Sequence, residues 1–213
     1  MHAIQPLQLD NFDENRDLAH RYIQRFFDHG DINSEHAVDC VFCAFPKNAA
    51  IEHILAKIGV LDSLYSTNVY YFNRVAKRIS ELNIDDAIAV SDENIIDSLA
   101  NITITMNNGT EKHKKLYSFA SKYCHFHRPE VYHLYDGNVQ RVLNEYPPAG
   151  WKSYFFGDGS KKYSDFVVCL RQFACSYGLQ QLSVRDLDKF LWGYGQDLLN
   201  NDAENRSSKK MNQ

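Results

Sequence analysis

Residues 54–82 read ILAKIGVLDSLYSTNVYYFNRVAKRISEL, and this stretch decides the fold. Apolar residues recur in it at three- and four-residue spacing on both sides of the polar segment 66–68. They are Ile54, Leu55, Ile58, Leu61 and Leu64 before that segment, and Phe72, Val75, Ala76, Ile79 and Leu82 after it. Such spacing places apolar side chains on one face of a helix. The stretch therefore predicts two amphipathic helices that pack against each other as the core hairpin.

The same periodicity continues outward along the chain. It predicts further helices over residues 13–28, 34–45, 91–99, 111–127, 136–146 and 161–177, and a last helix capped by Ser183. Asn107-Asn108-Gly109 has the composition of a turn. Asp136 directly precedes an apolar helical pattern, which makes it a natural N-cap residue.

Composition supports a helical fold of ordinary size. The chain has 213 residues, of which 44% are hydrophobic and 13% aromatic, enough apolar surface for a core. Glycine (10) and proline (5) are scarce, which argues against a turn-rich all-β protein. We therefore expect a mainly α protein, a single-domain helical bundle over residues 1–199. Residues 200–213 have almost nothing to bury, so they are expected to form a disordered tail.

Charge and cysteine usage bound the environment and the partners. The formal net charge is -4, so any nucleic-acid site must be a local patch. The five cysteines are scattered and no secretory signal pattern precedes them, which favours reduced thiols and a cytoplasmic location. No apolar run approaches the roughly 20 residues that span a bilayer.

The region from Glu111 to Arg128 is the one distinctly basic part of the sequence. It holds five lysine or arginine residues against one acid, together with three histidines. A cluster of this kind is typical of a local nucleic-acid patch. The alternative interpretation is that the lysines form a solvated helix face and that Asp136 only caps its helix.

Residues 115–143, KLYSFASKYCHFHRPEVYHLYDGNVQRVL, resemble a segment of the helix-hairpin-helix DNA glycosylases, the endonuclease III-like superfamily. In that segment a helix with a buried alanine leads through an extended stretch to the catalytic aspartate. Matching Ala120 to that alanine places Asp136 at the catalytic position. Residues 54–82 are similar to the paired helices that carry the family's damage-probing turn, which falls on residues 65–68 here. The resemblance covers residues 50–143.

Three features of the family are missing from this sequence. In the family, glycines of the hairpin allow backbone amides to approach a DNA phosphate closely. The corresponding residues here, 113–118, include no glycine. Ser118 occupies the position of the lyase lysine, so the resemblance implies a monofunctional enzyme. Cys169 and Cys175 do not supply the four thiolates of an iron-sulfur cluster. No cofactor is expected.

The resemblance implies hydrolysis of an N-glycosidic bond in DNA. Asp136 would stabilise the oxocarbenium-like state, and Lys122 would orient Asp136 or protonate the leaving base. DNA would contact Lys112, Lys114, Lys115, Tyr65 and His125, and the extruded base would stack on Tyr65, Tyr123 or Trp151. The alternative is a non-catalytic helical module that binds nucleic acid or a protein partner, and the sequence leaves both open.

Two remaining motifs favour structural interpretations. Cys40-x-x-Cys43 could supply half of a zinc site. Cys124, His125 and His127 are also possible ligand types, but nothing in the sequence places them beside the two cysteines. No metal site is therefore predicted: Cys40 and Cys43 are expected to be small core residues, and His127 a helix-end residue that meets the dipole. Trp192-Gly193-Tyr194-Gly195 indicates packing and a helix end, and residues 157–160 lack the ending of a phosphate-binding P-loop.

Overall fold

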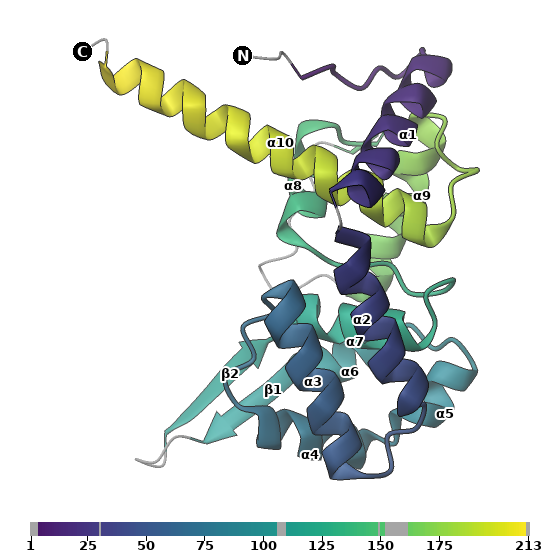
Figure 1. The fold of residues 1–213 in the computed structure, drawn as a ribbon, viewed down its shortest axis with the longest axis vertical. Coiled ribbons are helices and arrows are strands. Elements are labelled where there is room, and N and C mark those ends of the chain that lie inside the picture. The colour runs from purple at the N-terminus through teal and green to yellow at the C-terminus, as the bar shows by residue number, and fades with distance from the viewer. Residues whose placement is uncertain (1–3, 30, 106–109, 149, 152–161, 212–213) are drawn as a thin grey trace. The chain divides into compact units, whose positions relative to one another are not determined.

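The computed structural model describes residues 4–29, 31–105, 110–148, 150–151 and 162–211 of the chain (Figure 1). Over these residues the protein is mainly helical, with ten helices and one sheet of two strands, which confirms the predicted class. The turn predicted at residues 107–109 and the loop at 157–160 lie outside the described residues.

The chain divides into two compact units. The central unit comprises Gly30–Tyr135 with Lys162–Ser164, and the terminal unit comprises Met1–His29, Asp136–Lys161 and Asp165–Gln213. The single domain over residues 1–199 stays a prediction. Periodicity shows no boundary, because both units are built from amphipathic helices of the same kind.

The central unit contains six of the helices and both strands. They are α2 (Asp31–Ala44), α3 (Ile51–Tyr65), α4 (Phe72–Leu82), α5 (Ile84–Ala89), α6 (Asn94–Ala100), β1 (Asn101–Thr105), β2 (Glu111–Lys115) and α7 (Tyr117–His127). Helices α3 and α4 pack against each other, so the predicted core hairpin is confirmed. Ile58 of α3 and Ile79 of α4 are fully buried between them and their neighbours.

The segment from Glu111 to Lys115 is a strand, which corrects the predicted helix over residues 111–127. β2 pairs with β1 antiparallel, with Ile102 opposite Lys114 and Thr103 opposite His113. Helix α7 begins only at Tyr117. The pairing partner has the sequence NITIT, whose β-branched residues favour a strand. Helical periodicity over residues 111–115 was therefore misleading, since the tertiary pairing decides the conformation.

The terminal unit is built from α1 (Phe12–Asp28), α8 (Gly137–Glu145), α9 (Tyr163–Ser176) after its first turn, and α10 (Val184–Met211). Helix α10 packs against both α8 and α1. The residues predicted to face inward from α9 and α10 are buried. They are Phe166, Val167, Leu170, Phe173, Ala174, Leu187, Phe190, Leu191 and Tyr194.

Glycine at position 195 permits the close approach of α10 to α8. A Cβ atom added there would lie 2.3 Å from the backbone oxygen of Asn138. The segment Trp192-Gly193-Tyr194-Gly195 thus serves packing as predicted, but it is not a helix end, because α10 continues to Met211. The structure is helical where the sequence predicts a disordered tail from Asn200. Polar residues can extend a helix that is already nucleated upstream, although they bury little.

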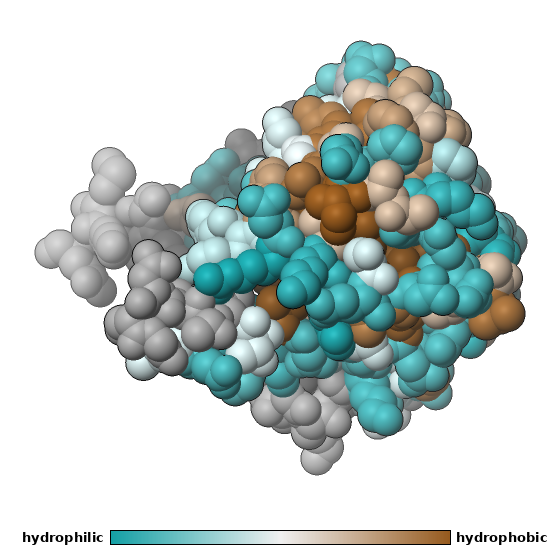
Figure 2. Space-filling model, turned by 90° about the horizontal axis from the view of Figure 1, so that it is seen from below, coloured by the Kyte–Doolittle hydropathy of each residue, from teal (hydrophilic) through white to brown (hydrophobic). Residues whose placement is uncertain are grey.

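None of the described helices is long and apolar enough to cross a membrane. The face shown in Figure 2 is mostly hydrophilic, with apolar residues gathered in one area of it.

Candidate nucleic-acid interface

Asp136 is the N-cap of α8, as the sequence predicts. Its half-buried side chain accepts a hydrogen bond from the backbone N–H of Asn138 at 2.8 Å. This bond satisfies one of the N–H groups that have no partner inside the helix. The cap is thus an observed role of Asp136, while its catalytic role stays a prediction.

Lys122 belongs to α7 of the central unit, whereas Asp136 belongs to the terminal unit. The Lys122 side chain is buried, and its ammonium group donates to the hydroxyl oxygen of Ser118 at 2.8 Å. Ser118 lies one helical turn before Lys122. The ammonium group of Lys122 is therefore held within its own helix.

His125 and Tyr123 are buried in α7 and offer no surface to DNA. The His125 ring is 3% exposed, and its Nδ1 donates to the backbone oxygen of Tyr132 at 2.6 Å. Tyr123 is fully buried. These two rings therefore support the core and the stretch after α7, which differs from the roles that the sequence suggests for them.

Tyr65 and Trp151 are only half-buried. The Tyr65 ring packs edge-on against Phe126, with ring centroids 5.5 Å apart. The Trp151 indole N–H donates to the side-chain oxygen of Gln172. Tyr65 belongs to the central unit and Trp151 to the terminal unit.

The predicted DNA-binding lysines lie on β2, and every residue of this strand is exposed. Because side chains alternate along a strand, Lys112 and Lys114 point to one face of the two-stranded sheet and Lys115 to the other. The hydrogen bond of 2.9 Å between the Thr103 hydroxyl and His113 Nδ1 marks the face of Lys115. The lysines thus form a cationic ribbon rather than one side of a helix.

A groove between α4 and β1 adds three cations that the sequence analysis missed. It has a volume of about 540 Å³. Its lining consists of Arg74, Lys77, Arg78 and Glu81 of α4 and Asn101, Ile102 and Thr103 of β1. The spacing of Arg74, Lys77 and Arg78 places them on one helix face, a signal that was present in the sequence. That this face opposes a strand became visible only in the fold.

The cations of the groove are only partly neutralised. Lys77 pairs with Glu81 at 3.8 Å, an exposed i,i+4 ion pair. Arg78 donates through Nη2 to the backbone oxygen of Ser98 at 3.1 Å, while its Nε is buried without a hydrogen-bond partner. The guanidinium of Arg74 lies over the ring of Tyr71, 5.6 Å from its centroid. Both arginines are thus held in place by neutral groups and retain their charge for a ligand.

The buried ammonium group of Lys57 stabilises the core of the central unit. Lys57 of α3 is fully buried, and its Nζ donates to the backbone oxygens of Phe45 and Lys47 at 3.1 and 3.2 Å. A third bond of 2.6 Å goes to the side-chain oxygen of Asn48. Burial lowers the pKa of Lys57 to about 8, and the nearby Asp85 opposes that shift. This cluster joins the α2–α3 connection to the core.

His127 takes part in the same cluster. Its Nε2 lies 3.3 Å from the ammonium nitrogen of Lys57 and 3.3 Å from Asn48 Nδ2. Burial, and next the charge of Lys57, lower the pKa of His127 to about 3. The ring is therefore neutral at pH 7. His127 is the last residue of α7, the helix-end position that the sequence predicts.

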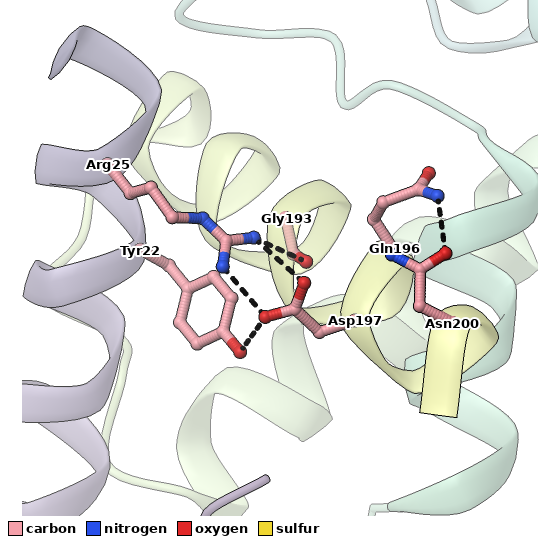
Figure 3. A network of polar contacts seen from close by, with 6 residues as sticks. All are labelled: Tyr22, Arg25, Gly193, Gln196, Asp197 and Asn200. Carbon is pink, nitrogen blue, oxygen red and sulfur yellow. Dashed lines mark hydrogen bonds and ion pairs between the residues drawn. The ribbon is translucent and has the colours of Figure 1, made fainter. Parts of the chain in front are cut away.

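The terminal unit has a polar network of its own, shown in Figure 3. Asp197 accepts from Tyr22 Oη at 2.7 Å and from the two terminal nitrogens of Arg25 at 2.7 and 3.1 Å (Figure 3). Desolvation acts to raise the pKa of Asp197, but the bonds from Arg25 and Tyr22 outweigh it and lower that pKa. The network borders a cavity of about 350 Å³ and joins α1 to α10.

Cys40 and Cys43 are exposed on α2, which corrects their predicted burial. Cys124 is buried, as is His125. Among the residues that the structure describes, no group of three or more His, Cys, Asp or Glu side chains converges as the ligands of a metal would.

Comparison with known proteins shows which family the chain is similar to. Residues 18–131 match the model of HI_0787_N, described as an N-terminal domain. An uncharacterized protein of Haemophilus influenzae is 32% identical over 149 residues, which are 70% of this chain and 69% of that protein. No solved structure matches the chain.

Proposed function

The chain belongs to the HI_0787_N family, and we propose that its central unit binds the phosphate backbone of nucleic acid in the groove between α4 and β1. The observation that carries this proposal is the charge of the groove. Arg74, Lys77 and Arg78 oppose a single carboxylate, that of Glu81, among the described residues that line it. Guanidinium groups offer planar sets of donors that match phosphate oxygens.

The lysines of β2 extend the proposed surface. Lys112, Lys114 and Lys115 are exposed, and they form no ion pair within the described part of the chain. Together with the three cations of α4 they make six positive charges. Because Lys115 points to the other face of the sheet, a single ligand contacts the remaining five. The logarithm of its duplex binding constant should then fall with the logarithm of salt concentration at a slope of about -4.5.

The acidic balance of the whole chain limits this binding to a local surface. The formal net charge of -4 repels a polyanion at long range, so attraction arises only near the groove and β2. Affinity is therefore expected to depend steeply on salt and weakly on sequence, because phosphate contacts carry no base information.

A titration of a fluorescent 20-base-pair duplex over several salt concentrations tests the proposal. The wild-type protein should bind with a steep negative slope, and Arg78→Gln should weaken binding and make the slope shallower by about 0.9. Lys47→Gln is the matched control, because Lys47 is exposed in the same unit and does not line the groove. A flat salt dependence would sink the proposal and favour a protein partner instead.

A second candidate function is hydrolysis of an N-glycosidic bond of an extruded base, as in DNA glycosylases. Ala120 is fully buried in α7, residues 132–136 form no helix, and Asp136 caps α8. This order of elements is the one that the resemblance implies, and it supports Asp136 as the catalytic carboxylate. Ser118 stands at the lyase position, so water is the attacking group in this proposal.

The proposed chemistry depends on the carboxylate of Asp136. The carboxylate of Asp136 stabilises the positive charge that develops on the sugar and orients a water molecule for attack. Lys122 belongs to the central unit, where it donates to Ser118 within α7.

Asp136→Asn tests this second function. Asparagine caps a helix about as well as aspartate, so the melting temperature and DNA affinity should stay nearly unchanged. Base release from a panel of duplexes, each with one damaged base, should be abolished. If the wild-type protein releases no base from any of them, the chain is a binding module without this activity.

A further inference from the structure

Tyr70 of the central unit is unusually exposed, and the proposed phosphate binding in the groove does not explain this exposure. Its side chain is 80% exposed, the highest value among the exposed large hydrophobic residues of the described chain. Aromatic side chains contribute most when they are buried, so a displayed ring forgoes a large stabilisation. Tyr70 stands two residues before α4, the helix that lines the groove.

The loop that presents Tyr70 is well organised. One carboxylate oxygen of Asp62 accepts from the hydroxyl of Thr67 at 2.9 Å and from the backbone N–H of Val69 at 2.8 Å. The side chain of Val69 is 2% exposed and anchors the loop in the core. The loop thus fixes the backbone immediately before Tyr70 while leaving its ring in solvent.

Two strained residues in the same loop add to this order. Ser66 and Asn68 have φ values of 48° and 57°, in the left-handed region that non-glycine residues seldom adopt. The side-chain amide of Asn68 donates to the backbone oxygen of Ser66 at 2.9 Å. Such conformations persist only where the surroundings impose them. The display of Tyr70 is therefore a property of the fold rather than of a loose segment.

The cations of α4 follow Tyr70 along the chain. Tyr71 occupies the N-cap position of α4, and the guanidinium of Arg74 lies over its ring. Arg78 lies one turn further, about 6 Å along the helix axis. An exposed ring thus precedes the helix whose cations line the groove, and Arg74, the first of them, follows Tyr70 by four residues. A flat apolar surface beside a cationic track is the arrangement that binds single-stranded nucleic acid.

We propose that the ring of Tyr70 stacks on an unpaired base of a single strand whose phosphates lie in the groove between α4 and β1. This inference rests on the proposed binding of nucleic acid by the groove. A base inside a duplex is stacked on both faces, so it has no free face for Tyr70. The site therefore selects a strand with unpaired bases over a duplex.

The test compares the affinity for a 12-nucleotide oligothymidine with that for a 12-base-pair duplex, each measured by fluorescence anisotropy. The wild-type protein should prefer the single strand. Tyr70→Ala should weaken single-strand binding by roughly 5- to 100-fold and leave duplex binding unchanged, because base-aromatic stacking is lost. Tyr70→Phe keeps the ring and should behave as the wild-type protein does.

Val90→Ala controls for the loss of any exposed apolar group, since Val90 is 76% exposed in the same unit. It should change neither affinity. If Tyr70→Ala binds the single strand normally while Arg78→Gln weakens both ligands, the stacking inference is overturned and the phosphate groove remains. If Arg78→Gln has no effect on either ligand, the groove itself is wrong.

Discussion

Lys57 shows how one residue can organise the core of the central unit. A fully buried ammonium group would be costly, but three oxygen acceptors surround it. The rings of Phe42 and Tyr123 complete the site, with centroids 5.5 and 5.4 Å from the nitrogen. The charge is thus solvated by the protein instead of by water.

The lowered pKa of Lys57 predicts a pH-dependent contribution to stability. The folded value is about 8 and the ordinary value is 10.5, so between these values the unfolded chain binds more protons than the folded one. The free energy of unfolding contributed by Lys57 should therefore rise with pH in this window, by about 1 to 3 kcal/mol. Urea unfolding of the wild-type protein and Lys57→Met at pH 7 to 10.5 measures it.

The difference between the two proteins isolates Lys57 from other groups. Burial raises the pKa values of Cys124 and Tyr123, which lowers stability at high pH in both proteins alike. The stability of the wild-type protein should gain on that of Lys57→Met as pH rises. A constant difference across the window would contradict the prediction. Lys47→Met, at an exposed position, should show a constant difference.

The residues of the candidate site differ in how far the sequence predicts their positions. The N-cap position of Asp136 was predictable, because an N-cap is a local pattern that precedes the apolar residues of a helix. The cations of α4 were also visible, as an i, i+3, i+4 set. His125 and Tyr123 were assigned to a surface or a site because of their chemistry. Their burial depends on which helices cover α7, and no local pattern specifies that.

At the scale of elements, helices with a strong apolar stripe were predictable and the strands were not. Helices α3, α4, α8 and α9 follow the predicted stripes. β2 has the sequence EKHKK, which has no apolar residues at either helical or strand spacing. Its conformation comes from pairing with β1, whose Ile102 is buried. A short polar strand of this kind is specified by its partner rather than by its own sequence.

The contact between α8 and α10 gives a prediction for Gly195. Alanine there would place its Cβ 2.3 Å from the backbone oxygen of Asn138, so the two helices must separate. Gly195→Ala should lower the free energy of unfolding by about 1 to 3 kcal/mol. Chemical denaturation measures the loss, and a variant of unchanged stability would contradict the close contact.

Gly59→Ala is the matched control for that substitution. A Cβ at position 59 of α3 would meet only Phe72 Cε2, at an ordinary distance of 3.9 Å. Alanine is a better helix former than glycine, so this variant should be stabilised by about 0.5 to 1 kcal/mol. Opposite signs for the two glycines separate steric exclusion from helix propensity.

At the scale of the whole molecule, the central unit is discontinuous in sequence. Tyr163 comes from the start of α9, yet its hydroxyl donates to the backbone oxygen of His133 at 2.7 Å. Its backbone N–H donates to the carboxylate of Asp97 at 3.1 Å. The periodicity of apolar residues indicates each helix, but it does not indicate which distant segments of the chain come together in one unit.

Tyr163→Phe tests the importance of this return. The phenylalanine ring fills the same space but leaves the buried oxygen of His133 without its donor, so stability should fall by about 1 to 2 kcal/mol. Hydrogen exchange should show faster opening in the stretch before α8. Tyr177→Phe should have a smaller effect, because the Tyr177 hydroxyl donates to Pro147 over a longer distance of 3.4 Å.

The two-stranded sheet has a consequence for how the protein behaves in concentrated solution. Within the described residues β2 pairs only with β1, so its outer edge presents backbone groups to which a strand of another molecule could add. Charged side chains, lysine above all, discourage such edge-to-edge association. We therefore expect the β2 lysines to oppose association at this edge by electrostatic repulsion. Neutralising all three at once should turn this exposed edge into a point of self-association.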